Sequence, residues 1–146
     1  SEVDIVLDIF SDYNQQVKNI ISATPPAELF KWGIFSREPV SRWSADKITL
    51  LGDAAHPIEP FMGQGASLAI EDGVVLGRII EMASSTKEII SRYESSRVER
   101  AHFVTDHSKK AGQRFTGSDP DKYSKEDHKN EEELGLFHYD PGSVIV

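Results

Sequence analysis

The chain has 146 residues, a formal net charge of −8 and no cysteine. Its length is sufficient for one ordinary domain. The absence of cysteine excludes disulfides and thiolate metal sites and is typical of a reducing compartment, so we expect a cytoplasmic location. The acidic balance argues against a nucleic-acid partner, because phosphate binding requires a basic face. No apolar run approaches the roughly 20 residues of a membrane helix, so no membrane partner is expected.

The first part of the chain is predicted to contain a helix and a strand. Residues 3–21 have a mixed apolar spacing and are followed by Pro25 and Pro26, which predicts a helix that ends before the prolines. Residues 28–35 alternate between apolar and other side chains, which predicts a strand with one apolar face. The apolar positions of that face are Phe30, Trp32 and Ile34.

A strand that ends at a carboxylate occupies the centre of the chain. Residues 47–51 are predicted to form a buried strand that stops at Gly52 and presents Asp53 just beyond its end. In open α/β sheets, ligands bind beyond the carboxyl ends of strands, where such a carboxylate can accept a hydrogen bond from a sugar hydroxyl. A plain turn or helix-cap role is the alternative for Asp53.

A loop and a glycine turn then lead into a helix. Pro57 and Pro60 stiffen the loop, and the Gly-x-Gly turn at 63–65 precedes a helix predicted over 67–82. The first amides of such a helix have no intrahelical partner and can bind an anion or a polar ligand edge. Its predicted buried stripe consists of Leu68, Val75, Ile79 and Met82.

The last part of the chain is predicted to begin with a second helix. The hydroxyls of residues 84–86 can cap a helix that runs from about residue 87 to residue 110. Proline, glycine and acidic residues follow from Gly117 onward. No metal site is expected, because the remaining histidines lack the spacing of metal ligands. These histidines are His102, His107, His128 and His138.

Residues 50–72 resemble the flavin-binding "GD" segment of the single-component FAD-dependent aromatic hydroxylases, the group that includes salicylate and 4-hydroxybenzoate hydroxylases. Residues 35–43, the helical run 92–100 and residues 136–140 are similar to other segments of these enzymes. The resemblance implies an α/β fold, in which this chain forms the C-terminal part of a FAD/NAD(P)-binding flavoprotein monooxygenase. It also implies FAD as cofactor and NAD(P)H as electron donor.

The Gly-x-Gly-x-x-Gly turn that binds the ADP part of FAD in this family has no counterpart in the chain. Gly63 and Gly65 lack a third glycine at the required spacing. Gly73 and Gly77 lie inside the predicted helix, where we expect them to pack closely against a neighbouring element. The chain is therefore interpreted as a C-terminal portion whose partner is the missing N-terminal portion of the same protein. Four regions are expected: 1–46, the end of the substrate-domain sheet; 47–83, the FAD-binding strand, loop and helix; 84–116, a helical region; and 117–146, an acidic, loop-rich tail.

The resemblance places cofactor contacts in the turn and at the start of the helix. Asp53 would contact the FAD chain between ribitol and pyrophosphate, and the backbone at Gly63 and Gly65 would approach the flavin closely. The first helix amides would face the pyrimidine edge and stabilise the negative charge of reduced flavin. Several family members have asparagine where this chain has Ser67, so only a backbone contact is assigned there. The predicted cofactor-binding set is Gly52, Asp53, Gly63, Gly65, Ala66 and Ser67.

The substrate side of the flavin is assigned to the loop before the helix. Three apolar residues would lie between flavin and substrate, with a hydrophobic loop anchor as the alternative. Gln64 would bond to flavin or substrate, or remain solvated. His56 is a candidate acid–base group because histidine titrates near neutrality, although a structural hydrogen bond is favoured. The three apolar residues are Pro60, Phe61 and Met62.

Two further charged residues are candidates for the site. Arg37 could orient a substrate carboxylate, but an ion pair is the favoured role. Asp72 is expected to pair locally or to lie at the helix surface rather than to take part in chemistry.

The function implied by the resemblance is hydroxylation of a small aromatic substrate with FAD, NAD(P)H and O2 through a flavin C4a-hydroperoxide. The chain alone is expected to be inactive, because half of the cofactor site is absent from it. Another flavoprotein with the same motif, such as an epoxidase or a halogenase, is one alternative. A non-catalytic remnant or interaction domain and a generic nucleotide binder are the others.

Overall fold

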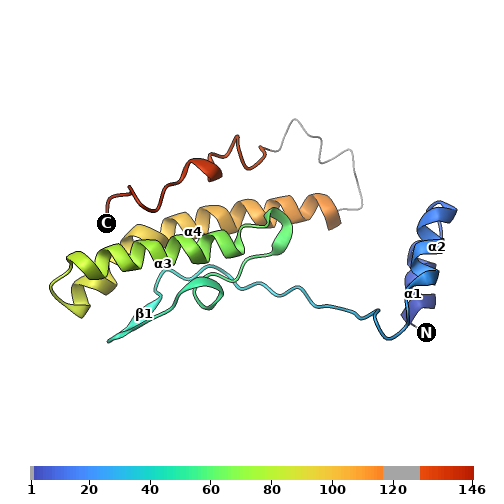
Figure 1. Ribbon diagram of the computed structural model, residues 1–146, viewed down its shortest axis with the longest axis horizontal. Coiled ribbons are helices and arrows are strands. Elements are labelled where there is room, and N and C mark those ends of the chain that lie inside the picture. The colour runs from blue at the N-terminus through green and yellow to red at the C-terminus, as the bar shows by residue number, and fades with distance from the viewer. Residues whose placement is uncertain (1, 117–128) are drawn as a thin grey trace. The chain divides into compact units, whose positions relative to one another are not determined.

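The computed structural model describes residues 2–116 and 129–146, and it divides the chain into two units, Ser1–Ile34 and Phe35–Val146 (Figure 1). Part of the predicted acidic tail, residues 117–128, therefore lies outside the described residues. No helix in the described part of the chain is long and apolar enough to cross a membrane.

The first unit contains two helices where one was predicted. Helix α1 spans Glu2–Ile9 and helix α2 spans Gln15–Ala23. Asn14 interrupts the predicted helix, because its side chain accepts a hydrogen bond from the Val17 amide at 3.1 Å and thereby caps α2. The predicted end before the two prolines is confirmed.

The predicted strand over 28–35 is wrong, since the structure shows no strand there. Phe30 and Trp32 are 67% and 78% exposed, so the alternating apolar positions cover no core within the described residues. An apolar alternation forms a strand only where a neighbouring strand supplies the hydrogen-bonding partners.

The second unit begins with a short antiparallel hairpin. Strand β1 spans Ser44–Ala45 and strand β2 spans Ile48–Thr49, with Ser44 opposite Thr49. The predicted strand over 47–51 is thus present but shorter than expected. These two strands form the sheet of the described residues, which are otherwise mostly helical.

Two long helices form the body of the second unit. Helix α3 spans Gly65–Met82, and helix α4 spans Thr86–Thr116 and lies beside it (Figure 1). Both predicted helices are confirmed, although each begins slightly earlier than expected and α4 is longer. The predicted cap of α4 is also confirmed, because the Ser85 hydroxyl accepts a hydrogen bond from the Glu88 amide at 3.2 Å.

The core lies between these helices and the segment that precedes them. Leu68, Val75 and Ile79 of α3 are fully buried as predicted, whereas Met82 is 52% exposed and lies outside the core. One cluster packs around Trp43 of the hairpin and Tyr93 of α4. The other packs around Met62, Leu68, Val104 and Leu136.

The C-terminal segment runs along the two helices (Figure 1). It contains a 3-10 turn, η5, at Leu136–His138, and Leu136 is only 3% exposed. Arg78 of α3 donates hydrogen bonds to the carbonyls of Pro141 at 2.7 Å and Val144 at 3.0 Å. Side chains of the helices therefore hold the backbone of this segment.

Candidate functional site

A tight turn after β2 presents the predicted cofactor-binding carboxylate. The 3-10 turn η1 spans Gly52–Ala54, and the Gly52 carbonyl accepts bonds from the amides of Ala55 at 2.8 Å and His56 at 2.9 Å. Gly52 has φ of 59°, and a Cβ there would lie 3.2 Å from that of Ala69, so the position favours glycine. Asp53 is exposed, and its carboxylate bonds to no described residue.

The start of α3 lies next to this carboxylate. A Cβ built on Gly65 would lie 3.9 Å from Asp53 Oδ1 and 3.2 Å from Ile58 Cγ2. The first intrahelical bond runs from the Leu68 amide to the Gln64 carbonyl at 2.9 Å. The preceding amides therefore have no intrahelical acceptor. These are the amides of Gly65, Ala66 and Ser67.

The loop before α3 is anchored by its apolar residues. It contains the 3-10 turn η2 at Pro60–Met62 and ends at Gly63, whose φ is 62°. Met62 is buried in the core, while the Phe61 ring lies against Gly112 of α4. Gln64 donates a bond to the Met62 carbonyl at 3.2 Å. Pro60 is the exposed residue of this turn.

Behind the turn lies a buried carboxylate, Asp72. It is fully buried, so the expected surface position is wrong, whereas the alternative expectation, a paired carboxylate, agrees with its bonds to His56 and Arg97. Its Oδ2 accepts hydrogen bonds from the Gly52 amide at 3.0 Å and from His56 Nε2 at 2.6 Å. Its Oδ1 accepts a bond from Arg97 Nε at 2.7 Å. The favoured structural role of His56 agrees with this bond.

The network continues through α4 to the C-terminal segment. Arg97 also donates to Glu71 Oε2 at 2.8 Å and to the Tyr139 hydroxyl at 2.6 Å. Arg100 donates to Glu71 Oε1 at 2.9 Å, and its guanidinium lies 4.4 Å from the centre of the Tyr139 ring. Two carboxylates and two guanidiniums therefore balance in charge, which a buried cluster requires.

Burial and hydrogen bonding shift two pKa values here in opposite senses. Burial by itself would raise the pKa of Asp72, but bonds from His56, Arg97 and the Gly52 amide outweigh it and lower that pKa. Burial, with the nearby Asp72 charge, raises the pKa of Tyr93 far above its usual value. Asp72 is therefore ionised and Tyr93 neutral near pH 7.

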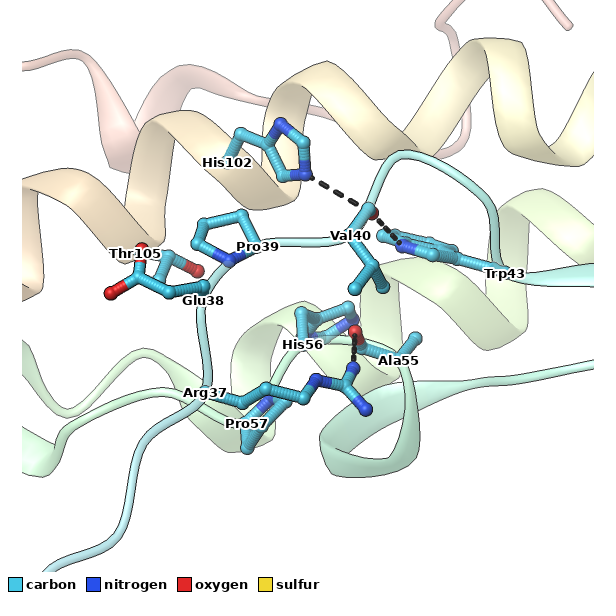
Figure 2. A pocket seen from close by; sticks show the side chains of 10 residues that line it. All are labelled: Arg37, Glu38, Pro39, Val40, Trp43, Ala55, His56, Pro57, His102 and Thr105. Carbon is cyan, nitrogen blue, oxygen red and sulfur yellow. Dashed lines mark hydrogen bonds between the residues drawn. The ribbon is translucent and has the colours of Figure 1, made fainter.

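A small pocket lies on the other side of the turn (Figure 2). Arg37 borders it and donates bonds to the carbonyls of Ala55 at 2.6 Å and Ala54 at 3.3 Å. The predicted ion pair of Arg37 is thus replaced by bonds to the turn backbone. His56 also lines the cavity, and its Nδ1 is buried without a hydrogen-bond partner among the described residues.

The predicted site residues thus fall into two groups. Asp53 and the first amides of α3 lie together at one exposed edge, whereas Gly52 is buried against Ala69 and His56 is buried behind the turn. The expected close packing of Gly73 and Gly77 is wrong within the described residues, because a Cβ at either would meet nothing within 4 Å.

The polar partners of the turn were not predicted, although the sequence contains a signal for them. Asp72 follows Leu68 by four residues and precedes Val75 by three, so it lies in the phase of the buried stripe of α3. A charged residue at such a position requires a charged partner, which Arg97 supplies from α4.

Donors and acceptors at the exposed edge fit a flavin nucleotide. An unpaired carboxylate can accept hydrogen bonds from sugar or ribitol hydroxyls, and free helix amides can donate to carbonyl or ring-nitrogen acceptors. The described residues contain no group of three side chains that could hold a metal ion.

Comparison with known proteins agrees with this chemistry. Over 108 residues the chain is 37% identical to the aurachin C monooxygenase/isomerase of Stigmatella aurantiaca, covering 74% of this chain and 28% of that protein. It is 42% identical over 97 residues to the 6-hydroxynicotinate 3-monooxygenase of Pseudomonas fluorescens, covering 65% of this chain and 25% of that enzyme. The chain therefore spans about a quarter of the length of these relatives.

A solved structure shows the same fold. Klebsiella pneumoniae HpxO complexed with FAD and uric acid superposes with a TM-score of 0.70 and 29% sequence identity, covering 83% of this chain and 32% of that one. Residues 8–108 match the FAD binding domain family. The chain thus has a flavoprotein monooxygenase fold and belongs to the FAD binding domain family.

Proposed function

We propose that this chain is the C-terminal, flavin-contacting portion of an FAD-dependent monooxygenase that hydroxylates a small aromatic substrate with NAD(P)H and O2. The observation that carries the proposal is the position of the exposed Asp53 carboxylate beside the unpaired amides at the start of α3. The relatives support the reaction class, because they include a 6-hydroxynicotinate 3-monooxygenase and a 3-hydroxybenzoate 6-hydroxylase.

The exposed edge would hold FAD through complementary contacts. Asp53 accepts hydrogen bonds from hydroxyls of the chain between ribitol and pyrophosphate. The amides of Gly65, Ala66 and Ser67 donate to the pyrimidine edge, and the positive end of α3 favours negative charge there. Bound FAD supplies the redox chemistry, and the protein supplies binding, orientation and exclusion of water.

The loop before α3 would form part of the substrate side. Pro60 is exposed, and Gly63 leaves open space beside the helix start, since a Cβ there would meet nothing within 4 Å. Phe61 and Met62 act through the loop that they anchor. We propose a small aromatic ring with polar substituents as substrate, because 6-hydroxynicotinate and uric acid occur in the names of similar proteins.

The assignment of Asp53 is tested by measuring FAD affinity in the full-length protein that contains this sequence. Asp53→Ala should raise the dissociation constant for FAD by at least about tenfold, because a charge-assisted hydrogen bond contributes about 1.5–3 kcal/mol. Glu99→Ala is the matched control, since Glu99 is an exposed carboxylate on α4. Equal FAD affinity in the Asp53→Ala variant and the unmodified protein would contradict the assignment.

A further inference from the structure

The two ends of the turn that carries Asp53 are tied to one carboxylate oxygen. Asp72 Oδ2 accepts a hydrogen bond from the Gly52 amide at 3.0 Å and another from His56 Nε2 at 2.6 Å. Gly52 directly precedes Asp53, and His56 follows it by three residues. The position of Asp72 therefore determines where both ends of the turn lie.

The Asp72 carboxylate is itself held in place. Arg97 Nε binds its other oxygen at 2.7 Å, and Arg97 is fully buried and also bonded to Glu71. A carboxylate that is bonded on both oxygens and excluded from water has little rotational freedom. Asp72 thus connects the turn to two helices.

Arg37 restrains the same turn from the cavity side (Figure 2). Its guanidinium donates to the carbonyls of Ala54 and Ala55. The turn backbone is therefore bonded on both sides, while the Asp53 side chain is exposed and makes no bond to the described residues. Such an arrangement fixes a ligand-binding group before the ligand arrives.

We propose that Asp72 is a positioning residue that orders the Gly52–His56 turn and so sets the affinity of the Asp53 edge for FAD. This inference rests on the proposed function. Ordering a loop during binding costs conformational entropy, and a turn that is already ordered avoids this cost. Asp72 touches no part of the exposed edge and acts through the two hydrogen bonds that it accepts from the turn.

A pair of His56 variants tests the inference while leaving Asp72 and Arg97 in place. His56→Leu removes the donor to Asp72, whereas in His56→Gln the side-chain amide can replace Nε2 as donor. We expect His56→Leu to raise the dissociation constant for FAD about tenfold, and His56→Gln to stay within about threefold of the unmodified protein. Both are measured in the full-length protein by titrating the FAD-free form with FAD and following flavin fluorescence.

Asp72→Asn gives a second measurement, with Asp46→Asn as control, because Asp46 is an exposed residue of the β1–β2 turn. Asp72→Asn should weaken FAD binding and shift the visible absorption band of the FAD-saturated protein, whereas Asp46→Asn should do neither. If Asp72→Asn fails to fold, the His56 pair decides.

Three results would overturn the inference. The first is unchanged FAD affinity in His56→Leu even though its unfolding temperature falls, which indicates a role in stability alone. The second is an equal loss of affinity in His56→Leu and His56→Gln, which indicates that the ring itself is needed. The third is an unmodified protein that binds no FAD, which would overturn the proposed function as well and is thereby distinguished from the first two.

Discussion

At the scale of single residues, Gly112 makes room for the aromatic side chain that anchors the loop before α3. A Cβ at this position would lie 2.3 Å from Phe61 Cδ2 and 2.4 Å from Phe61 Cε2. Such distances are far below van der Waals contact, so the ring and its loop would have to move. Gly112 is thus required by the loop, although it lies in a helix, where alanine is otherwise favoured.

Gly112→Ala should therefore destabilise the protein. Displacing a ring from a packed position costs about 1–3 kcal/mol, and thermal unfolding of the variant measures this loss. A variant as stable as the unmodified protein would show that Phe61 does not pack on Gly112 as described.

The same substitution at Gly77 should have the opposite effect. A Cβ there meets nothing within 4 Å, so Gly77→Ala should stabilise α3 by about 0.5–1 kcal/mol. A lower unfolding temperature in this variant would show that an element beyond the described residues packs on that face.

The buried carboxylate of Asp72 should contribute a pH-dependent part of stability. Its folded-state pKa lies below the ordinary value of 3.8, so the contribution is fully present above that pH and is lost as the pH falls through the lowered pKa. Asp72→Asn leaves a buried guanidinium without one partner and should cost about 3–5 kcal/mol at pH 7. The stability difference between the two proteins should shrink below about pH 3.8, and a difference independent of pH would contradict this account.

At the scale of elements, α4 holds the segments in front of it through polar side chains on one face. Glu94 accepts bonds from the amides of Trp43 and Ser44 at 2.6 Å each. The Ser108 hydroxyl donates to the Glu59 carbonyl at 2.6 Å. These bonds place the hairpin and the loop before α3 on the same helix, so the position of α4 determines the geometry of the site.

The start of α4 should consequently be sensitive to its cap. Ser85→Ala removes the hydroxyl that accepts a hydrogen bond from the Glu88 amide. This substitution should reduce the free energy of unfolding by about 1 kcal/mol. Ser84→Ala is the matched control, because Ser84 contributes its backbone amide, which donates to Glu88 at 2.9 Å. Equal effects of both substitutions would exclude a specific cap at Ser85.

The sequence predicted the long elements well because their signals are local. The helix starts at Gly65 and Thr86 follow from glycine and hydroxyl patterns within a few residues. The prediction of a strand over 28–35 was wrong because an apolar alternation does not reveal whether a partner strand exists. The burial of Asp72 and the identity of its partner could not be predicted for a similar reason, since Arg97 lies 25 residues away and contacts Asp72 only when α3 and α4 pack together.

At the scale of the whole molecule, the chain combines one exposed polar edge with a buried charge-balanced network behind it. Asp53 and the first amides of α3 form the edge, and Asp72 links the turn to α4 and the C-terminal segment. The chain spans 28% of one monooxygenase relative and 25% of another. The proposed activity is therefore a property of the full-length protein.

Measuring the incorporation of oxygen into an aromatic product tests the proposed monooxygenase activity most directly. The full-length protein, supplied with FAD, NAD(P)H and 18O2, is incubated with a panel of hydroxylated aromatic acids, and the products are analysed by mass spectrometry. The account predicts a hydroxylated product that carries one 18O atom and is formed only when FAD and NAD(P)H are both present. NAD(P)H oxidation without 18O in any aromatic product of the panel would contradict it.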